Sequence, residues 1–264
     1  MKCAITGSSG VLGSNFIKKN NNIDFIKFEG DLSKKNQIIK WINKNEFDFF
    51  LHFGAIVPTA KVEKNYKTAK SINLDSIKVI INELKKKKKK IWFFFPSSSH
   101  IYSFSNKKLN EKSKKIPISK YGKLKLLAER LIKKSLRKTQ INYCIGRIFS
   151  FTHFKQKKSY VIPSIFLGKA NVTSTFRDFI DVRDICDCIC FLMKRKTNGF
   201  YNIASGRKTN LMKIDSIINN KKIKYIKKSK NNLFADISKI KNLGWKPKYN
   251  INDIIKEYKK KIKN

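Results

Sequence analysis

Short apolar runs alternate along the chain with longer stretches in which apolar residues recur every three or four positions. The short runs predict strands at 2–6, 23–28, 47–55, 90–98 and 141–149, and the longer stretches predict helices at 10–20, 68–85 and 119–138. The expected strands are almost continuously apolar. This is typical of a parallel sheet whose two faces are both covered by helices, and it places the chain in the α/β class.

The regular alternation loosens after residue 150. A helix is expected within 176–194, short apolar runs stand at 199–206 and 223–228, and an amphipathic helix is expected at 250–262. We therefore expect a sheet domain over 1–150, to which 177–204 returns. A smaller portion is expected over 151–176 and 205–264.

The net charge of +42 raises the question of a nucleic-acid partner. Only seven of the 60 basic residues are Arg, and Lys is accompanied by many Asn, Ile and Phe residues, as A/T-rich codons would produce in any protein. Arg is the residue typically used for bidentate contacts to bases and phosphates, so nucleic acid is not expected as a partner. The lysine run at 85–90 is expected to be a solvated turn.

No stretch has the roughly 18 consecutive apolar residues that a membrane-spanning helix needs, and the N-terminus turns glycine-rich too early for a signal peptide. A soluble, cytoplasmic protein without a membrane partner is expected. Three of the five cysteines, Cys186, Cys188 and Cys190, alternate along one segment. Zinc ligands usually come as two spaced pairs, so we expect no metal site and interpret these cysteines as small buried apolar residues.

A glycine-rich turn, "TGSSGVLG", follows the first expected strand and opens the first expected helix. Gly7, Gly10 and Gly13 would allow a tight turn and close approach of the backbone to a pyrophosphate, beside the free N–H groups of the helix N-terminus. This context predicts a Rossmann-type doubly wound parallel sheet that binds a dinucleotide. The smaller C-terminal portion would then bind the substrate.

The spacing of these glycines resembles that of extended short-chain dehydrogenases/reductases, the NAD-dependent epimerase/dehydratase family. "GDL" at 30–32, "HFGA" at 52–55, "RDFIDVRDI" at 177–185, "YNIASG" at 201–206 and "LGWKPK" at 243–248 resemble further family motifs in the family's order. The resemblance implies that the cofactor-binding residues are Gly7, Ser9, Gly10, Val11, Gly13, Asp31, Leu32, Phe53, Gly54, Ala55, Asn73, Tyr121 and Lys125.

The pattern Tyr-x-x-x-Lys occurs twice, as Tyr66/Lys70 and as Tyr121/Lys125. The family's chemistry needs a Ser or Thr at a strand end about two dozen residues upstream, and the resemblance assigns this role to Ser98 in "PSSSHIY". Tyr121 and Lys125 lie one helical turn apart and share a face. A nearby ammonium favours ionisation of a phenol, so Tyr121 would act as acid or base. Tyr66/Lys70 is interpreted as a chance occurrence.

Sugar-nucleotide dehydratases of the family place Asp-Glu directly after the active hydroxyl, whereas this chain has Ser99 and His100. Dehydration is therefore disfavoured, and His100 is either a further acid or base or a polar residue of the substrate cleft. The resemblance implies substrate binding by Ser98, Ser99, Ser150, Tyr160 and Arg177. Arg177 would bind the diphosphate, with a lysine such as Lys230 as a less specific helper. Arg147 would be structural.

The cofactor is expected to be NAD or NADP. Glu29 after the second strand could bind the ribose 2′-hydroxyl and favour NAD, while Lys27 could instead accept a 2′-phosphate. The resemblance implies an NAD(P)-dependent epimerase or 4-ketoreductase acting on a nucleotide sugar in polysaccharide-precursor synthesis, as a homodimer through the helix at 119–138. Two alternatives stay open: a reductase of small non-nucleotide carbonyls, and a non-catalytic NAD(P)- or RNA-binding protein on the same fold.

Overall fold

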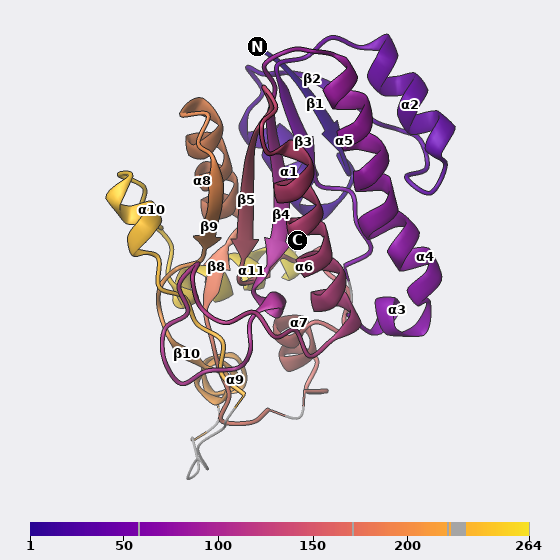
Figure 1. The fold of residues 1–264 in the computed structure, drawn as a ribbon. Helices are drawn as coiled ribbons and strands as arrows, with labels where there is room; N and C mark the ends of the chain where they lie inside the picture. Colours follow the sequence, from indigo (N-terminus) through magenta and orange to yellow (C-terminus); the bar gives the residue numbers. More distant parts are fainter. Residues whose placement is uncertain (58, 171, 221, 223–230, 264) are drawn as a thin grey trace. The chain divides into compact units, whose positions relative to one another are not determined.

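The computed structural model describes residues 1–57, 59–170, 172–220, 222 and 231–263 (Figure 1). The apolar run expected at 223–228 and Lys230 therefore lie outside the described residues. Within the described part, none of the helices is both long and apolar enough to span a membrane.

A six-stranded sheet forms the centre of the fold, in the order β2-β1-β3-β4-β5-β9. β1 pairs in parallel with both β2 and β3, and β3 pairs in parallel with β4. The expected α/β class and Rossmann-type parallel sheet are confirmed. Its strands are β1 (Lys2–Thr6), β2 (Asp24–Lys27), β3 (Phe49–His52), β4 (Trp92–Ser98), β5 (Asn142–Ile148) and β9 (Gly199–Ile203).

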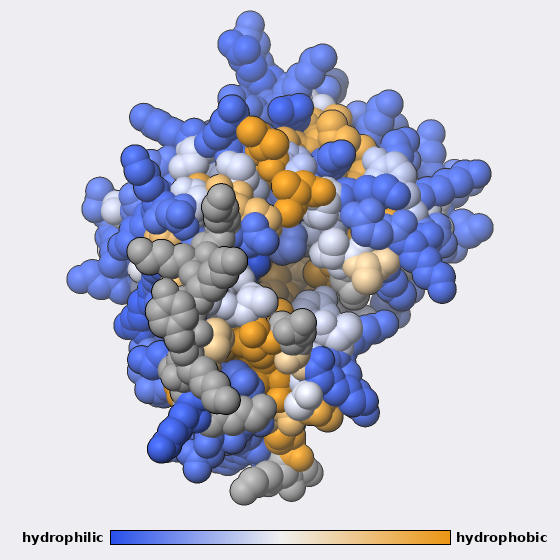
Figure 2. Space-filling model, turned by 90° about the horizontal axis from the view of Figure 1, so that it is seen from below, coloured by the Kyte–Doolittle hydropathy of each residue, from blue (hydrophilic) through white to orange (hydrophobic). Residues whose placement is uncertain are grey.

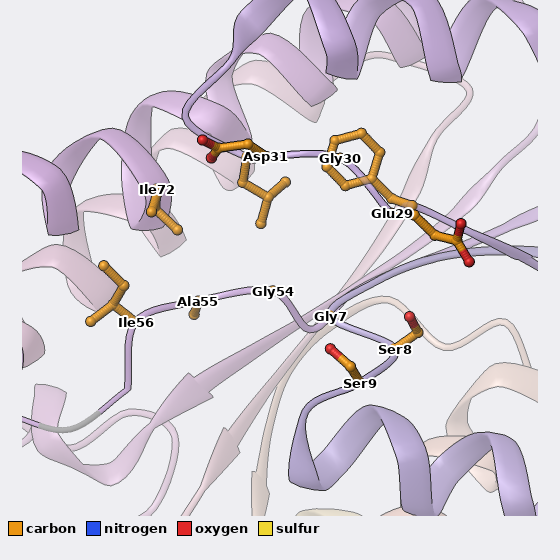
Figure 3. Close-up of a pocket in the computed structure, with 12 residues that line it drawn as sticks. Gly7, Ser8, Ser9, Glu29, Gly30, Asp31, Gly54, Ala55, Ile56 and Ile72 are labelled. Carbon is orange, nitrogen blue, oxygen red and sulfur yellow. The ribbon is translucent and has the colours of Figure 1, made fainter.

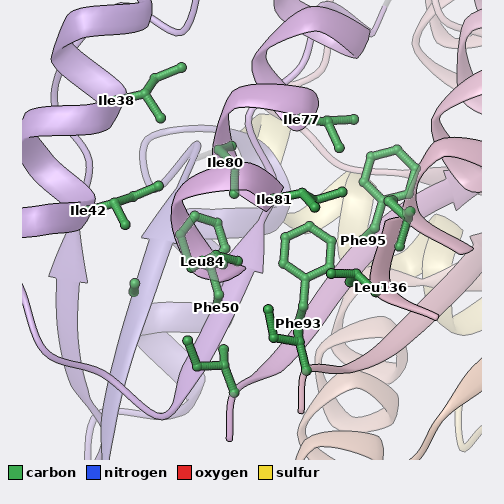
Figure 4. Close-up of a cluster of buried hydrophobic side chains, with 14 of the residues drawn as sticks. Ile38, Ile42, Phe50, Ile77, Ile80, Ile81, Leu84, Phe93, Phe95 and Leu136 are labelled. Carbon is green, nitrogen blue, oxygen red and sulfur yellow. The ribbon is translucent and has the colours of Figure 1, made fainter. Parts of the chain in front are cut away.

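Helices cover the sheet because each presents one apolar face. α2, α5 and α6 pack along one face, where their aliphatic side chains meet Phe50 of β3 and Phe93 and Phe95 of β4 (Figure 4). α1 lies against the opposite face, where Phe16 contacts Phe25 and Phe53 edge to face. The bounds are α1 (Val11–Lys19), α2 (Lys35–Lys44), α3 (Thr59–Lys64), α4 (Tyr66–Lys70), α5 (Ser76–Lys86) and α6 (Lys120–Leu136).

The chain divides into two compact units. The first consists of Met1–Ser103, Lys114–Arg147 and Ile189–Tyr201, and it holds most of the large sheet. The second consists of Phe104–Ser113, Ile148–Cys188 and Asn202–Asn264. Two short π- and 3₁₀-helical segments also belong to the first unit, η1 (Ser71–Asp75) and η2 (Ser99–Ile101).

Asp178 organises the second unit. Its fully buried carboxylate accepts hydrogen bonds from the backbone of Ser205, Gly206 and Ala235 and from the Ser205 hydroxyl. One side chain therefore joins three chain segments. The elements here are β6 (Ser150–Thr152), α7 (Val161–Phe166), β7 (Phe176–Arg177), β8 (Phe179–Asp181), α8 (Val182–Lys194, which continues into the first unit), β10 (Thr209–Asn210), α9 (Leu211–Asn219), α10 (Ser238–Asn242) and α11 (Ile251–Lys263).

The lysine run at 85–90 is less solvated than the sequence suggests. Lys87 pairs with Glu46 at 2.8 Å and Lys89 pairs with Asp48 at 3.0 Å, so the end of α5 is tied to the segment before β3. The side chain of Lys87 is only 10% exposed, and it also faces the Phe47 ring. Cys186 and Cys188 are buried on α8, as expected for small apolar side chains, and Cys190 is partly buried.

Candidate functional site

The glycine-rich turn between β1 and α1 approaches a second turn after β3. Gly7 has φ +70°, which favours glycine, and a Cβ there would lie 2.5 Å from the backbone nitrogen of Gly54. A Cβ on Gly13 would lie 2.2 Å from the carbonyl oxygen of Gly7. No side chain fits at either position, so this is a cradle in which a ligand can meet bare backbone at a helix N-terminus.

A pocket of about 500 Å³ opens beside these turns (Figure 3). Its wall comes from the glycine-rich turn, the segment after β2, the turn after β3 and the start of η1. Six residues of the expected cofactor set line it: Gly7, Ser9, Asp31, Leu32, Gly54 and Ala55. The other seven are not among its lining residues: Gly10, Val11, Gly13, Phe53, Asn73, Tyr121 and Lys125. The remaining lining residues are Ser8, Phe28, Glu29, Gly30, Ile56 and Ile72.

The segment after β2 is held as a turn by its own polar groups. The carboxylate of Asp31 accepts a hydrogen bond from the backbone N–H of Ser33 at 2.8 Å, and this bond holds the pKa of Asp31 below its usual value. The backbone N–H of Asp31 donates to the side chain of Gln37 at 2.7 Å. Glu29 and Asp31 both belong to the wall of the pocket, and their carboxylates point in different directions on either side of Gly30 (Figure 3).

Asn73 acts on the pocket through the backbone of Ile56. Its side-chain oxygen accepts from the Ile56 N–H at 2.7 Å, and its amide nitrogen donates to the Ile56 carbonyl at 2.8 Å. Asn73 lies in η1, a single π-helical turn between α4 and α5. Such turns frequently mark functional sites because the extra residue redirects a side chain. Here it fixes the loop that lines the pocket.

Ser98, His100, Tyr121 and Lys125 come together at the carboxyl end of β4. The Ser98 hydroxyl accepts from the His100 N–H at 3.2 Å, and the His100 and Tyr121 rings lie edge to face with centroids 5.8 Å apart. The Lys125 ammonium lies 5.9 Å from the centroid of the Tyr121 ring. Ser98, Tyr121 and Lys125 are buried, whereas His100 is exposed.

The ammonium of Lys125 is fully buried. It donates to the carbonyl of Pro96 at 2.8 Å and lies over the ring of Phe95, 4.5 Å from its centroid. Burial lowers the pKa of Lys125 to about 7, although the nearby Glu129 carboxylate opposes this shift. The side chain therefore changes its protonation state near neutral pH.

Arg147 is buried on β5, where its guanidinium binds Glu129 of α6. Its guanidinium makes two hydrogen bonds to Glu129, at 3.0 and 2.8 Å, and a third to the hydroxyl of Tyr102 at 2.9 Å. The pair with Glu129 is almost fully buried and keeps the pKa of Arg147 above its usual value despite burial. It joins α6 to β5 within the first unit.

The second Tyr-x-x-x-Lys pattern lies on a surface helix. Tyr66 is exposed on α4, and Lys70 forms an exposed pair with Asp75. The ammonium of Lys120 faces the Tyr66 ring from 5.7 Å. This setting offers neither the burial nor the strand-end hydroxyl that Tyr121 and Lys125 have, in keeping with the interpretation of Tyr66/Lys70 as a chance occurrence.

Of the four remaining expected substrate residues, three belong to the second unit. Ser150 begins β6, and Tyr160 precedes α7 with its phenol partly buried, which raises its pKa. Arg177 donates to the carbonyls of Phe176 and Asn231, and burial lowers its pKa to about 10. Ser99 belongs to the first unit, where it is buried in η2.

Two residues that the sequence analysis did not single out shape the site. A Cβ on Gly122 would lie 2.2 Å from the carbonyl oxygen of His100, so only glycine lets α6 approach this turn. The sequence signal for this close approach was a glycine inside the expected helix, directly after Tyr121. His52 is fully buried at the end of β3. Its signals were its place at the end of an apolar strand and at the start of the motif "HFGA".

Comparison with known proteins identifies the family. The model of the family described as "GDP-mannose 4,6 dehydratase" matches residues 6–258 of the chain. The chain belongs to this family, and it is an NAD(P)-dependent enzyme of the extended short-chain dehydrogenase/reductase type.

Individual relatives are distant but cover nearly the whole chain. ADP-L-glycero-D-manno-heptose-6-epimerase of Brachyspira hyodysenteriae is 23% identical, over 96% of this chain and 95% of that protein. The structure of Thermus thermophilus UDP-glucose 4-epimerase in complex with NAD has a TM-score of 0.84 at 15% identity, covering 97% of this chain and 96% of that one. RMD from Pseudomonas aeruginosa, complexed with NADPH, has a TM-score of 0.85 at 18% identity, with 97% coverage of both chains. The two structures support the fold.

Proposed function

We propose that the protein is a nucleotide-sugar epimerase or 4-ketoreductase that transfers hydride at a sugar carbon, with Tyr121 as acid and base. The observation that carries this proposal is the buried ammonium of Lys125 beside the Tyr121 ring, at the end of the strand that holds Ser98. A binding protein would not need an ammonium buried at this cost beside a phenol.

The glycine cradle fits a dinucleotide, because Gly7 and Gly13 leave no room for side chains where a pyrophosphate would meet the backbone. When bound, the nicotinamide supplies the hydride acceptor or donor. Tyr121 would remove the proton of the sugar hydroxyl or return it to a ketone. Protonated Lys125 favours the phenolate form of Tyr121 and can donate to the cofactor ribose, and Ser98 would orient the reacting oxygen.

We infer that NAD is preferred over NADP. The pocket wall includes Glu29 and Asp31, whose carboxylates would repel a 2′-phosphate, while a ribose 2′-hydroxyl can donate to Glu29. Lys27, the residue that would have favoured NADP, is not among the lining residues. This preference makes Glu29 the cofactor-selecting residue.

Dehydration is not part of the proposed reaction, although the family is named for it. Dehydratases of the family have an Asp-Glu pair directly after the active hydroxyl, and this chain has Ser99 and His100 there. No carboxylate next to Ser98 is therefore available to assist the elimination of water. His100, exposed and edge to face with Tyr121, is the candidate for a second acid or base during epimerisation. The substrate would be a nucleotide sugar whose diphosphate is bound by Arg177.

The proposal is tested with a panel of UDP-, GDP-, CDP- and dTDP-sugars and their 4-keto forms, each with NADH and NADPH. Absorbance at 340 nm and product NMR separate reduction, which consumes cofactor, from epimerisation, which does not. Tyr121→Phe should lower turnover by about 10²–10⁴-fold, since it removes the acid/base group. The matched control Tyr66→Phe, at the exposed second pattern, should leave turnover unchanged.

Other outcomes would replace the proposal. Turnover of small ketones without any nucleotide sugar would favour the carbonyl-reductase alternative. Tight RNA binding at physiological salt without turnover of any compound in the panel would favour the binding-protein alternative. Equal losses in Tyr121→Phe and Tyr66→Phe would remove Tyr121 from the mechanism.

We also propose a homodimer formed through α6. The exposed face of this helix carries Leu127 among Lys123, Arg130 and Lys134, so two copies would meet through one apolar residue surrounded by like charges. Such an interface should strengthen with ionic strength because salt screens the repulsion. Sedimentation equilibrium at low and high salt measures this directly, and a monomer at every salt concentration would contradict it.

A further inference from the structure

His52 is a buried titratable residue without a role in the proposed reaction. It ends β3, is only 1% exposed, and is paired in register with Thr6 at the end of β1. Burial and, to a smaller extent, the charge of Lys125 lower the pKa of His52 to about 3. The imidazole is therefore neutral at any physiological pH.

One edge of this ring is connected to both turns of the cofactor cradle. His52 Nδ1 lies 2.8 Å from the hydroxyl oxygen of Thr6, and the same oxygen accepts the backbone N–H of Gly54 at 3.1 Å. A threonine hydroxyl has one hydrogen to donate and two lone pairs. With Nδ1 as acceptor, Thr6 donates its hydrogen to His52 and accepts from Gly54 with one of its lone pairs.

The spacing of the two turns leaves little freedom. Gly7 follows Thr6 directly, and a Cβ on Gly7 would collide with the backbone of Gly54. Both glycines line the pocket. A small relative shift of the two strand ends would therefore change the shape of the surface on which a dinucleotide rests. Thr6 joins the two ends through its hydroxyl and through its carbonyl, which accepts the N–H of Phe53 at 3.1 Å.

The ring faces of His52 connect to the catalytic side. His52 stacks on Phe95, with centroids 6.2 Å apart and an angle of 16° between the planes, and Lys125 lies over the same Phe95 ring. His52 Nε2 has no hydrogen-bond partner among the described residues. A charged imidazole here would be repelled by the ammonium of Lys125, so this packing requires the neutral form.

We propose that His52 is a positioning residue for the cofactor: through Thr6 it holds the Gly7 and Gly54 turns at the separation that dinucleotide binding requires. This inference rests on the proposed function to the extent that the cradle is the cofactor site. His52 itself touches neither the pocket nor the reacting groups, and acts through Thr6 and Phe95.

The test is a double-mutant cycle on cofactor affinity, measured as the Kd for NADH and NADPH by protein-fluorescence quenching, well below the melting temperature. His52→Phe keeps an aromatic ring but loses Nδ1, and Thr6→Val loses the hydroxyl. Each should weaken binding about tenfold, which corresponds to ~1.4 kcal/mol. In the Thr6→Val background, His52→Phe should have no further effect, because the two residues act through one bond.

His52→Asn is the rescue variant, since its amide can place a polar atom near the position of Nδ1; its Kd should stay within about threefold of the wild-type value. Single effects below twofold, or single effects that multiply in the double variant, would overturn the proposal. If His52→Phe does not fold, Thr6→Val and His52→Asn still decide: the first must weaken binding and the second must not.

The cycle separates this inference from the proposed function. A wild-type protein that binds neither cofactor would overturn both. Intact coupling between Thr6 and His52 without turnover of any sugar nucleotide would overturn the proposed reaction and leave the positioning role standing.

Discussion

In the proposed reaction, Lys125 serves the chemistry at the expense of stability. Its ammonium is buried against the Phe95 ring and donates a hydrogen bond to the Pro96 carbonyl. Removing an ammonium from water is costly, and the lowered pKa of Lys125 is the measure of that cost. The proposed phenolate of Tyr121 needs this charge, whereas the fold does not.

The pKa of Lys125 gives a prediction for the pH dependence of stability. A lysine with a pKa of about 7 in the folded protein and 10.5 when unfolded binds fewer protons folded than unfolded between these values. The contribution of Lys125 to the free energy of unfolding therefore becomes more favourable as the pH rises from about 7 to 10.5. Below pH 7 the full cost of burying the charged ammonium is present. Lys125→Met should raise the free energy of unfolding by a few kcal/mol at pH 6, and the gain should fade towards pH 10.5.

The measurement is urea unfolding at several pH values, with Lys123→Met as the matched control. Lys123 is exposed on the same helix, so its replacement should give a small difference that does not depend on pH between 6 and 10. Lys125→Met should also lose turnover. A destabilised Lys125→Met at pH 6 would show that the ammonium stabilises the fold.

At the same scale, the sequence indicated the proposed reacting groups but not their environment. The resemblance to the family selected Ser98, Tyr121 and Lys125, and the structure brings them to one strand end. The roles of Thr6, His52 and Gly122 depend on which strands become neighbours and how closely a helix approaches a turn. Each of these contacts is between residues more than twenty positions apart in the sequence, so a local sequence pattern cannot predict it.

At the scale of elements, a π-helical turn that holds Asn73 interrupts the helix between α4 and α5. The sequence predicts one helix over 68–85, and the structure gives α4, the π-helical turn η1 and α5 in succession. The apolar period holds in α5, where Ile77, Ile80 and Ile81 pack on the sheet. The π turn allows Asn73 to reach Ile56 without disturbing that register.

The approach of α6 to η2 gives a second prediction. Gly122→Ala adds a methyl group 2.2 Å from the carbonyl oxygen of His100, so the helix or the turn must move. Alanine is favoured over glycine within a helix by about 1 kcal/mol, yet this overpacking should destabilise the protein by about 1–3 kcal/mol. Turnover should fall at least tenfold, because Tyr121 and His100 flank the contact.

Thermal unfolding and turnover of Gly122→Ala are compared with Lys123→Ala, one position along the same helix and exposed. The control should be near neutral in both measurements. If Gly122→Ala were as stable and active as the wild type, the close contact between α6 and η2 would not be needed for the site.

Strand and helix positions were largely predictable because buried strands in a parallel sheet are almost purely apolar, as in β3 and β4. The exceptions have physical causes. The strand expected over 47–55 ends at His52, because the chain turns at Gly54 to meet Gly7. In the lysine run, Lys85, Lys86, Lys88 and Lys90 are exposed as expected. Lys87 and Lys89 are partly buried, because they pair with Glu46 and Asp48 before β3.

At the scale of the whole molecule, the charge of +42 is the dominant property. Hydrophilic side chains cover most of the face seen in Figure 2, and apolar side chains gather towards its middle. With 60 basic and 18 acidic residues, most cations have no acidic partner in the chain. Such an excess destabilises the compact state through self-repulsion.

Stability should therefore increase with ionic strength. Raising NaCl from about 20 to about 300 mM shortens the Debye length from roughly 20 Å to roughly 6 Å, which should raise the melting temperature by several degrees. Differential scanning calorimetry measures this, and choline chloride in place of NaCl tests for a specific effect of sodium. A melting temperature that falls steadily with either salt would mean that attractive ion pairs outweigh the repulsion.

The outermost position of β2 has a consequence for how the molecule behaves in crowded solution. A strand that ends a sheet offers its unpaired backbone groups to any extended chain that comes alongside, the usual beginning of aggregation. β2 is four residues long, begins with Asp24 and ends with Lys27, both exposed. Because β2 is short and has a charged residue at each end, another extended chain can form only a few hydrogen bonds with it, which limits aggregation through this edge.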